Sequence, residues 1–146
     1  MSLAGAYDAD NVFAKIIRGE IPSAKVFETD RVLAFMDAFP QTRGHCLVIS
    51  KVSTARNILD VEPDVLAELA SAVQRLGGAV TRALKPDGFV VTQFNGAPAG
   101  QTIFHLHFHV IPRWEGEPMG RHGQGMADPA DLKALATQIA AALENV

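Results

Sequence analysis

The spacing of apolar residues along the chain predicts two long amphipathic helices. The clearer one begins near Pro63, and its apolar residues recur at steps of three and four positions as far as Leu84. The other follows Asp128, a residue type that caps helices, and has Pro129 at the first helical position. Both helices carry a single apolar stripe, which is typical of helices that pack against a sheet.

Short apolar segments between turn residues predict about five β-strands. They lie at residues 25–28, 32–36, 45–49, 89–93 and 103–111. Only three polar residues separate the first two strands, so we expect a hairpin there. A short helix capped by Asn11 is predicted at residues 12–17. Because most connections are short, we predict an α+β fold with a largely antiparallel sheet of about five strands, one long helix, a short N-terminal helix and a C-terminal helix.

The composition is that of an ordinary soluble globular domain. The chain has 146 residues, of which 48% are apolar and 20% charged, which suits one domain with one core. The net charge of -3 argues against a nucleic-acid coat, which would need a basic stripe. A local pocket of donors can still bind a nucleotide. We expect one domain over residues 1–146, with the motifs in 11–113 and a C-terminal loop and helix in 114–146.

Neither a membrane location nor secretion is expected. No apolar run approaches the roughly 18 residues that span a bilayer, and the N-terminus lacks the charged start and apolar core of a signal peptide. The single cysteine, Cys46, stands in an apolar stretch and can form no internal disulfide, which fits a reducing compartment. We therefore predict a cytoplasmic protein.

The most informative segment holds three histidines at alternating positions, His105, His107 and His109. Side chains alternate between the two faces of a strand. The apolar residues between the histidines can therefore anchor the strand on the core while three imidazoles line the other face, about 7 Å apart. Since the chain has only five histidines, this alternation indicates a functional site.

Two kinds of site suit three aligned imidazoles. Neutral imidazole is a good zinc ligand, so a metal site is one possibility. A phosphate site is the other, because one imidazole can attack phosphorus while a second supplies a proton. The small-residue turn at residues 95–102 favours phosphate. Its glycines let backbone N–H groups approach an anion, and Gln101 and Thr102 add polar groups.

The histidine segment resembles the signature of the histidine-triad (HIT) family, His-φ-His-φ-His-φ-φ with φ apolar. Residues 105–111 match this signature at every position. The resemblance covers nearly the whole chain and is greatest with the bacterial, Hint-like members. Its other matching segments are residues 13–22, 33–37, 44–51 and 100–104. The resemblance implies the HIT fold and a homodimer in which two sheets join, with the long helix near the interface.

The resemblance also implies catalytic roles for four histidines. His107 resembles the nucleophile that takes the nucleoside monophosphate, which water then releases. His109 resembles the group that donates a proton to the leaving atom, and His105 and His45 resemble a supporting pair that orients the centre. A histidine at position 109 is similar to the hydrolase branch, since the transferase branch has glutamine there.

The nucleotide-binding residues are likewise implied by resemblance. Gln101 and the backbone of Thr102 match phosphate contacts, and Asp37 matches the carboxylate that binds the ribose hydroxyls. The residues that match the lining of the base pocket are Phe13, Ile16, Ile21, Phe35 and Met36.

The chain departs from the family pattern at two places that concern ligands. Many bacterial relatives have a Cys-x-x-Cys pair that helps to bind zinc, but this chain has Asn11 and Ala14 there, so we expect no structural zinc. The family often has asparagine at the position of Phe94, where its amide contacts the nucleotide. Asn95 or Gln93 is expected to take over that contact.

We therefore predict a purine nucleoside phosphoramidase or dinucleoside polyphosphate hydrolase that releases a nucleoside monophosphate such as AMP. It should need no cofactor or catalytic metal, form a homodimer, and bind neither nucleic acid nor membrane. Two alternatives stay open: a metalloprotein that uses the three histidines as ligands, and a non-catalytic module that binds a nucleotide or a partner. Loss of activity to a chelator would favour the first, and tight AMP binding without turnover the second.

Overall fold

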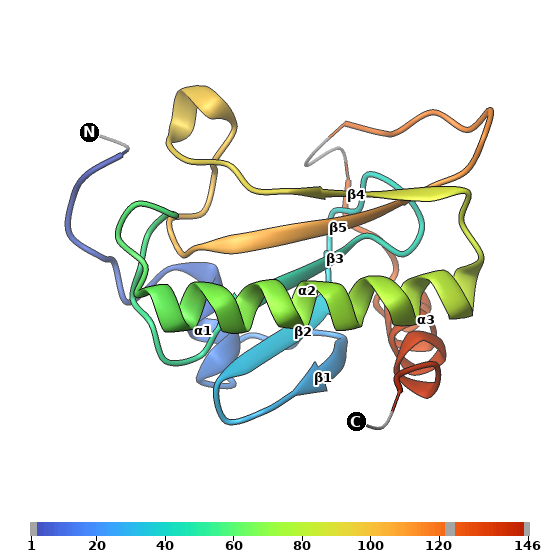
Figure 1. Cartoon of the computed structure of the whole chain (residues 1–146), viewed down its shortest axis with the longest axis horizontal. Helices are drawn as coiled ribbons and strands as arrows, with labels where there is room; N and C mark the ends of the chain where they lie inside the picture. Colours follow the sequence, from blue (N-terminus) through green and yellow to red (C-terminus); the bar gives the residue numbers. More distant parts are fainter. Residues whose placement is uncertain (1–2, 122–124, 145–146) are drawn as a thin grey trace.

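A five-stranded sheet and three α-helices make up the fold. The computed structural model describes residues 3–121 and 125–144. The sheet order is β1-β2-β3-β5-β4, and every neighbouring pair of strands is antiparallel. The strands are β1 (Lys25–Glu28), β2 (Val32–Met36), β3 (Cys46–Ser50), β4 (Gly88–Thr92) and β5 (His107–Arg113), and the helices are α1 (Val12–Ile17), α2 (Pro63–Leu84) and α3 (Pro129–Ala141), with a 3₁₀ turn, η1 (Ala97–Ala99). The predicted α+β class is confirmed (Figure 1).

Helices α1 and α3 begin directly after the capping residues that the sequence indicates. The Asn11 side chain accepts a hydrogen bond from the Ala14 N–H at 2.9 Å, and Asp128 accepts one from the Ala130 N–H at 2.9 Å. Helix α2 ends at Leu84, and the next residue, Lys85, has a left-handed φ of 53°. Among the described residues, no helix is both long and apolar enough to cross a membrane.

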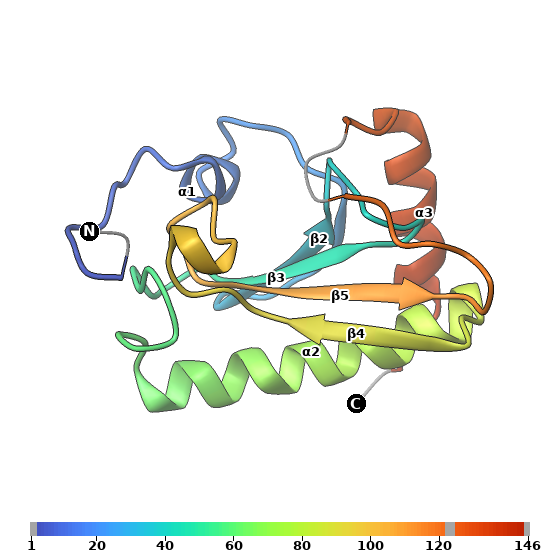
Figure 2. The same ribbon diagram turned by 90° about the horizontal axis from the view of Figure 1, so that it is seen from above.

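The sheet separates two apolar clusters, because side chains alternate along its buried strands. Helices α2 and α3 cover one face, where Ala34 of β2 and Val48 of β3 contribute to the larger cluster. Helix α1 covers the other face, where Leu33 and Leu47 contribute to the smaller cluster. Figure 2 shows α2 and α1 on opposite sides of the sheet. His107 and His109 of the motif lie on the α1 face, where they pair with Ile49 and Leu47 of this smaller cluster.

The histidine strand differs in extent from the prediction of residues 103–111. Strand β5 begins only at His107 and continues to Arg113, so the first histidine of the motif precedes the strand. The segment before it is tied to the loop after β3, since the Leu106 N–H donates to the Ala55 carbonyl at 3.0 Å. Strand β5 can extend through Pro112 because its pairing with β3 stops at Val110, so the missing N–H costs no bond on that side.

Two other strands are displaced by one residue. Strand β3 begins at Cys46, so His45 lies immediately before it, and β4 begins at Gly88. Both strands exist as predicted. Only their ends differ, and ends are the part that local sequence determines least.

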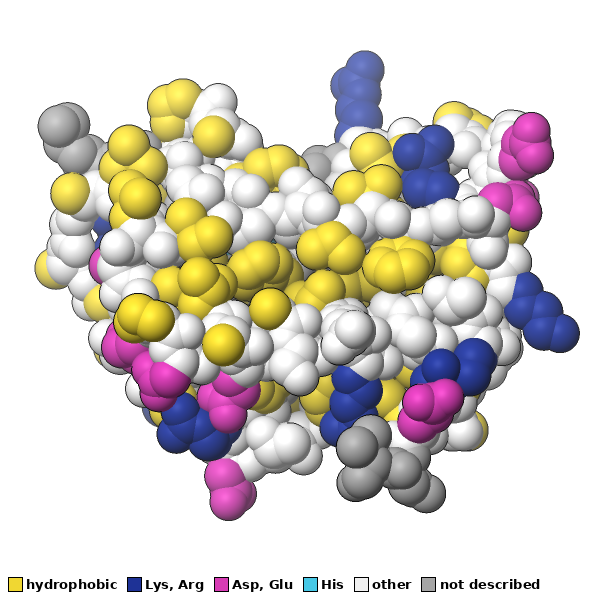
Figure 3. Space-filling view, viewed as in Figure 1, with side chains coloured by type: hydrophobic (Ala, Val, Ile, Leu, Met, Phe, Trp, Pro, Cys, Tyr) yellow, Lys and Arg dark blue, Asp and Glu magenta, His cyan; other side chains and the backbone are white. Residues whose placement is uncertain are grey.

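The edge of the sheet carries an apolar surface. Phe89, Val90 and Val91 of β4 are 43%, 36% and 47% exposed, and Figure 3 shows apolar side chains in a band across the face that α2 and β4 share. Gly77 of α2 permits close approach, because a Cβ there would lie 2.9 Å from the Phe89 ring. This band is therefore a large exposed apolar region of the kind that often marks an interface.

Candidate active site

Four histidines meet on the α1 side of the sheet. His107 and His109 project from β5, where they pair with Ile49 and Leu47 of β3. His45 immediately precedes β3, and His105 lies two residues before β5. Their exposed fractions are 0% for His45, 2% for His105, 1% for His109 and 6% for His107. The central histidine is thus the one that keeps most access to solvent.

The first histidine of the motif is anchored through both ring nitrogens. Nε2 of His105 lies 3.1 Å from the Ser50 carbonyl oxygen, which can only accept, so this nitrogen carries the proton. Nδ1 is therefore an acceptor, and the Tyr7 hydroxyl donates to it at 2.6 Å. Burial lowers the pKa of His105 to about 4, with a smaller contribution from the nearby His107, against the raising effect of the Ser50 carbonyl. His105 is therefore neutral near pH 7.

The central histidine is oriented by its neighbour's backbone. Nδ1 of His107 lies 2.8 Å from the His105 carbonyl oxygen, so Nδ1 donates. In a neutral ring this leaves the lone pair on Nε2. The Phe13 ring from α1 packs against His107 at a centroid distance of 4.9 Å and an interplanar angle of 78°. The ring of His107 is consequently held in one orientation, and its role as the nucleophile stays a prediction.

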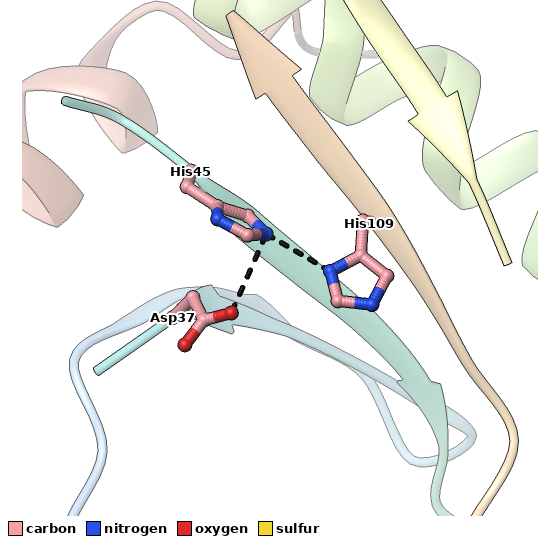
Figure 4. Close-up of side chains that lie close together, drawn as sticks. All are labelled: Asp37, His45 and His109. Carbon is pink, nitrogen blue, oxygen red and sulfur yellow. Dashed lines mark hydrogen bonds and ion pairs between the residues drawn. The ribbon is translucent and has the colours of Figure 1, made fainter. Parts of the chain in front are cut away.

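The third histidine receives its tautomer from a chain of hydrogen bonds that begins at a backbone amide. The Gln41 N–H donates to Nδ1 of His45 at 3.0 Å, so the proton of His45 resides on Nε2. That nitrogen lies 2.9 Å from Nδ1 of His109, which must accept. His109 therefore carries its own proton on Nε2. Figure 4 shows Nε2 of His45 joined both to His109 and to the carboxylate of Asp37. The Asp37 Oδ2 lies 3.4 Å from that nitrogen.

The two central rings therefore differ in the nitrogen that holds the proton. The centroids of His107 and His109 are 5.0 Å apart, and the hydrogen bonds above assign an Nε2 lone pair to the first and an Nε2–H to the second. A nucleophile beside a hydrogen-bond donor suits phosphoryl transfer, in which one group attacks phosphorus and another stabilises the charge that leaves it.

The turn before the motif is shaped by Gln101. Its Oε1 accepts from the Gly96 N–H at 2.8 Å, and its Nε2 donates to the carbonyl oxygens of Arg56 and Ile103 at 2.7 and 3.1 Å. Gly96 and Gly100 have φ values of 90° and 108°, which glycine adopts readily. The Gln101 amide thus holds the loop in shape, while Thr102 is exposed beside it. Phosphate contacts of these two residues stay predictions.

Phe94, which stands where the family often has asparagine, lies beside the third histidine of the motif. Its ring centroid is 5.4 Å from that of His109. Asn95 instead bonds within the protein, where its Oδ1 accepts from the Ile58 N–H at 2.9 Å and its amide pairs with Gln93. A nucleotide contact by Asn95 stays a prediction. The aromatic ring of Phe94 lines the site beside His109.

The predicted base-pocket residues divide between the two faces of the sheet. Phe13, Ile16 and Phe35 belong to the cluster on the histidine face, and Ile21 packs against it. Met36 belongs to the opposite cluster, where its sulfur lies 3.6 Å from the Cys46 sulfur. The expectation that Met36 lines the same pocket as Phe35 is therefore wrong, because adjacent residues of β2 face opposite ways.

Asp37 lies at the end of β2 within the histidine network. Its Oδ1 accepts from the Phe39 N–H at 2.8 Å, and its Oδ2 faces His45. The Asp37 side chain is 8% exposed. Its predicted contact with ribose hydroxyls stays a prediction, and the structure adds a contact with the supporting histidine.

The residues present do not fit the zinc site of the Cys-x-x-Cys relatives. The Asn11 side chain is used in capping α1, where its amide donates to the Asp8 carbonyl at 2.8 Å. Ala14 is buried and offers no ligand atom. No step of the chemistry is therefore assigned to such a metal.

The alternative of a metal held by the three motif histidines also loses support from the geometry. Among the described residues, the one group of potential ligand atoms within 4.8 Å of each other comes from Asp37, His45 and His109. The Gln41 N–H faces Nδ1 of His45 and thereby keeps a proton on Nε2, the nitrogen that a metal would need. The hydrogen bonds therefore favour a role in holding or transferring a proton, rather than metal binding, for Asp37, His45 and His109.

Comparisons with known proteins agree on one family. The HIT domain family model matches residues 18–116. A solved Hit-like protein from Bartonella henselae, described as involved in cell-cycle regulation, superposes with a TM-score of 0.90 at 47% identity, covering 95% of this chain and 100% of that chain. Protein hit of Bacillus subtilis is 38% identical over 138 residues, covering 92% of this chain and 94% of that protein. The adenosine 5'-monophosphoramidase hnt1 of Schizosaccharomyces pombe is 34% identical over 139 residues, covering 91% and 98%.

The fold and the site define a class of small α+β proteins in which a histidine-bearing strand crosses an antiparallel sheet. The matching model and the similar proteins put a name to that class. This chain belongs to the HIT family.

Two residues that support the site were not expected from the sequence. Tyr7 comes from the segment before α1, and Gln41 acts through its backbone N–H. The available signal for Tyr7 was that it is the only tyrosine of the chain. No side-chain pattern signals Gln41, because every residue type except proline has that N–H.

Proposed function

We propose that this protein is a purine nucleoside phosphoramidase that transfers the nucleotide to Nε2 of His107 before releasing it to water. The observation that carries the proposal is the pair of tautomers, with the lone pair of His107 beside the Nε2–H of His109. A relative named adenosine 5'-monophosphoramidase, alike over nearly its whole length, supports this substrate class. Dinucleoside polyphosphates present the same α-phosphate and are the second substrate class to compare.

The proposed reaction has two steps. In the first, the Nε2 lone pair of His107 forms a bond to the α-phosphorus, and the bond to the leaving atom breaks with its electron pair on that atom. The Nε2–H of His109 gives its proton to the leaving atom, so that the leaving group departs neutral, and the proton that water loses in the second step returns to Nε2 of His109. The nucleotidyl-imidazolium keeps its Nδ1–H on the His105 carbonyl.

In the second step water attacks the same phosphorus, and the bond to Nε2 breaks. The nucleoside monophosphate leaves, and His107 regains its neutral tautomer. Over the cycle one water is consumed, with its oxygen on phosphorus and one of its protons on the departed group. None of these bonds requires a cofactor.

The test compares wild type with His107→Asn for release of AMP from adenosine 5'-phosphoramidate and from diadenosine polyphosphates, with EDTA present. We expect turnover by the wild type alone, because asparagine has no nucleophilic nitrogen at this position. Circular dichroism checks that the variant is folded. Turnover by a folded His107→Asn protein would contradict the proposal. Turnover that depends on added zinc would favour the metal alternative, and AMP binding without turnover would favour a binding module.

The apolar band on β4 supports the predicted homodimer. Strand β4 is the last in the sheet, with three large apolar side chains exposed. Exposed apolar sheet edges tend to pair with another chain. We expect Val91→Glu to convert a dimer into monomers in sedimentation velocity. Val12→Glu on α1 is the matched control, since Val12 is 45% exposed and Val91 47%. A monomeric wild-type chain at micromolar concentration would contradict the dimer.

A further inference from the structure

The backbone N–H of Gln41 lies at the start of the hydrogen-bond chain that reaches His109. Gln41 stands in the loop between β2 and β3 and is half-buried. Its N–H is 3.0 Å from Nδ1 of His45. Nε2 of His45 in turn donates a hydrogen bond to Nδ1 of His109 at 2.9 Å. Gln41 itself touches none of the atoms that react.

The residue that holds Gln41 in place is distant in sequence. The Gly120 N–H donates to the Gln41 carbonyl oxygen at 2.7 Å, and Nε2 of Gln41 donates to the Gly120 carbonyl oxygen at 3.0 Å. We call these two bonds the Gln41–Gly120 clamp. A further bond from the Ala127 N–H to the Ala38 carbonyl, at 2.9 Å, ties the same loop to the segment before α3.

We propose that Gln41 is a positioning residue whose backbone N–H, held by the Gln41–Gly120 clamp, sets the tautomers of His45 and His109. The segment after β5 thereby acts on the leaving-group side of the reaction through hydrogen bonds alone. This inference rests on the proposed phosphoramidase function, because it states how His109 is kept ready to meet the leaving atom.

The physical reason is that one neutral imidazole has one proton and two nitrogens. With a donor facing Nδ1, His45 must keep its proton on Nε2, and His109 must then accept at Nδ1. Without that donor, His45 can hold the proton on Nδ1 and accept at Nε2. His109 would then donate from Nδ1 and lose the proton from Nε2, the nitrogen assigned to the leaving atom. The loop amide therefore selects between two arrangements of the same pair.

The direct test is the tautomeric state of the histidines by ¹⁵N NMR at neutral pH, which distinguishes a protonated ring nitrogen from an accepting one. Gln41→Pro removes the N–H, while Gln41→Met keeps it and removes only the side-chain half of the clamp. The matched control is Gln138→Met, because Nε2 of Gln138 also donates to a backbone carbonyl, that of Ala83 at 3.1 Å, but from α3.

We expect Nε2-protonated His45 and His109 in the wild type and in Gln138→Met, and a mixture of tautomers in Gln41→Pro. Gln41→Met should show a smaller share of the altered tautomer, because its N–H remains but the side-chain half of the Gln41–Gly120 clamp is lost. If Gln41→Pro does not fold, Gln41→Met decides. Wild-type tautomers in a folded Gln41→Pro protein, or in Gln41→Met where that variant decides, would overturn the inference. This readout needs no turnover, so it stands apart from the fate of the proposed function.

The second readout is turnover of two substrates that differ in the leaving group. Adenosine 5'-phosphoramidate releases a basic nitrogen that needs a donor, whereas the p-nitrophenyl ester of AMP releases a delocalised anion that needs little help. We expect Gln41→Pro to slow the phosphoramidate about tenfold and the ester less than about threefold. Equal slowing of both substrates would indicate a structural role and overturn the inference.

Discussion

The two histidines that flank His107 in the motif have the same side chain and opposite duties. His105 bonds to a fixed backbone carbonyl and to the Tyr7 hydroxyl, so both of its nitrogens are committed to the protein. His109 receives one hydrogen bond from His45, which assigns its proton to the other nitrogen. One histidine therefore anchors the ring of His107 through its carbonyl oxygen, and the other presents an N–H beside that ring.

The difference shows that the partner atom, not the residue type, decides what each imidazole does. A carbonyl oxygen can only accept, so the ring that it faces must donate at that nitrogen. A backbone N–H can only donate, so the ring that it faces must accept. Ser50 imposes the first condition on His105, and Gln41 imposes the second on His45. Two backbone groups thus fix the protons on the two sides of the site.

The largest effect that distinguishes the two sides is expected from His109→Ala. Removal of a donor aimed at developing charge costs about 100- to 1,000-fold in rate, and we expect that loss for adenosine 5'-phosphoramidate. The p-nitrophenyl ester of AMP should slow by only about tenfold or less, because its leaving group stabilises its own charge. Steady-state release of AMP from each substrate, by wild type and by His109→Ala, measures the two rate losses and their ratio.

His109→Gln is the matched control for that prediction, because its amide restores a donor of similar reach. It should recover part of the lost phosphoramidate activity. If His109→Ala slows both substrates equally, His109 only supports the structure, and the contrast with His105 disappears.

Most of the fold could be predicted from the sequence because its signals are local. Capping by Asn11 and Asp128 and the apolar stripe of α2 depend on neighbours within a few residues, and each helix begins where those signals predict. The start of β5 could not be predicted in this way. The segment that holds His105 alternates like a strand, but it bonds to the loop after β3 instead.

The histidines and the carboxylate that meet at the site could be predicted from the sequence, but their protonation could not. The pattern indicated His105, His107 and His109, and the family resemblance added His45 and Asp37. The tautomers were not predictable, because they depend on the Ser50 carbonyl at the end of β3 and the Gln41 N–H in the loop before it. These are backbone groups, which the residue types do not reveal. For Met36 the resemblance assigned a side chain to the pocket of its neighbour Phe35. Successive side chains of a strand point to opposite faces, so Met36 lies in the cluster on the other side of the sheet.

The smallest effect is expected on the anchoring side, from Tyr7→Phe. The variant loses the hydroxyl that donates to Nδ1 of His105 but keeps the ring that packs beside it. We expect a loss of about 1 kcal/mol in the free energy of unfolding near pH 7. Turnover of both substrates should fall equally and by less than about threefold, since the donor beside the leaving group is untouched. Urea unfolding and the two assays measure these quantities.

The pH dependence of the unfolding free energy distinguishes the bond between Tyr7 and His105 from an ordinary surface hydrogen bond. Burial lowers the pKa of His105 to about 4 from the usual 6.5, so the unfolded chain binds more protons between these values. The stability from the neutral ring is therefore complete above about pH 6.5 and is lost as the pH falls toward 4. The Tyr7 hydroxyl donates only to the neutral ring, so the difference in unfolding free energy between wild type and Tyr7→Phe should stay constant while the folded ring is neutral. It should narrow as the pH falls through about 4, where the folded ring takes up its proton. Thr137→Val, which removes a hydroxyl that donates to the Lys133 carbonyl at 3.0 Å on α3, should give a gap that does not change with pH. A gap for Tyr7→Phe that does not narrow as the pH falls through about 4 would mean that its hydroxyl does not recognise the neutral ring, and the assigned tautomer of His105 would be wrong.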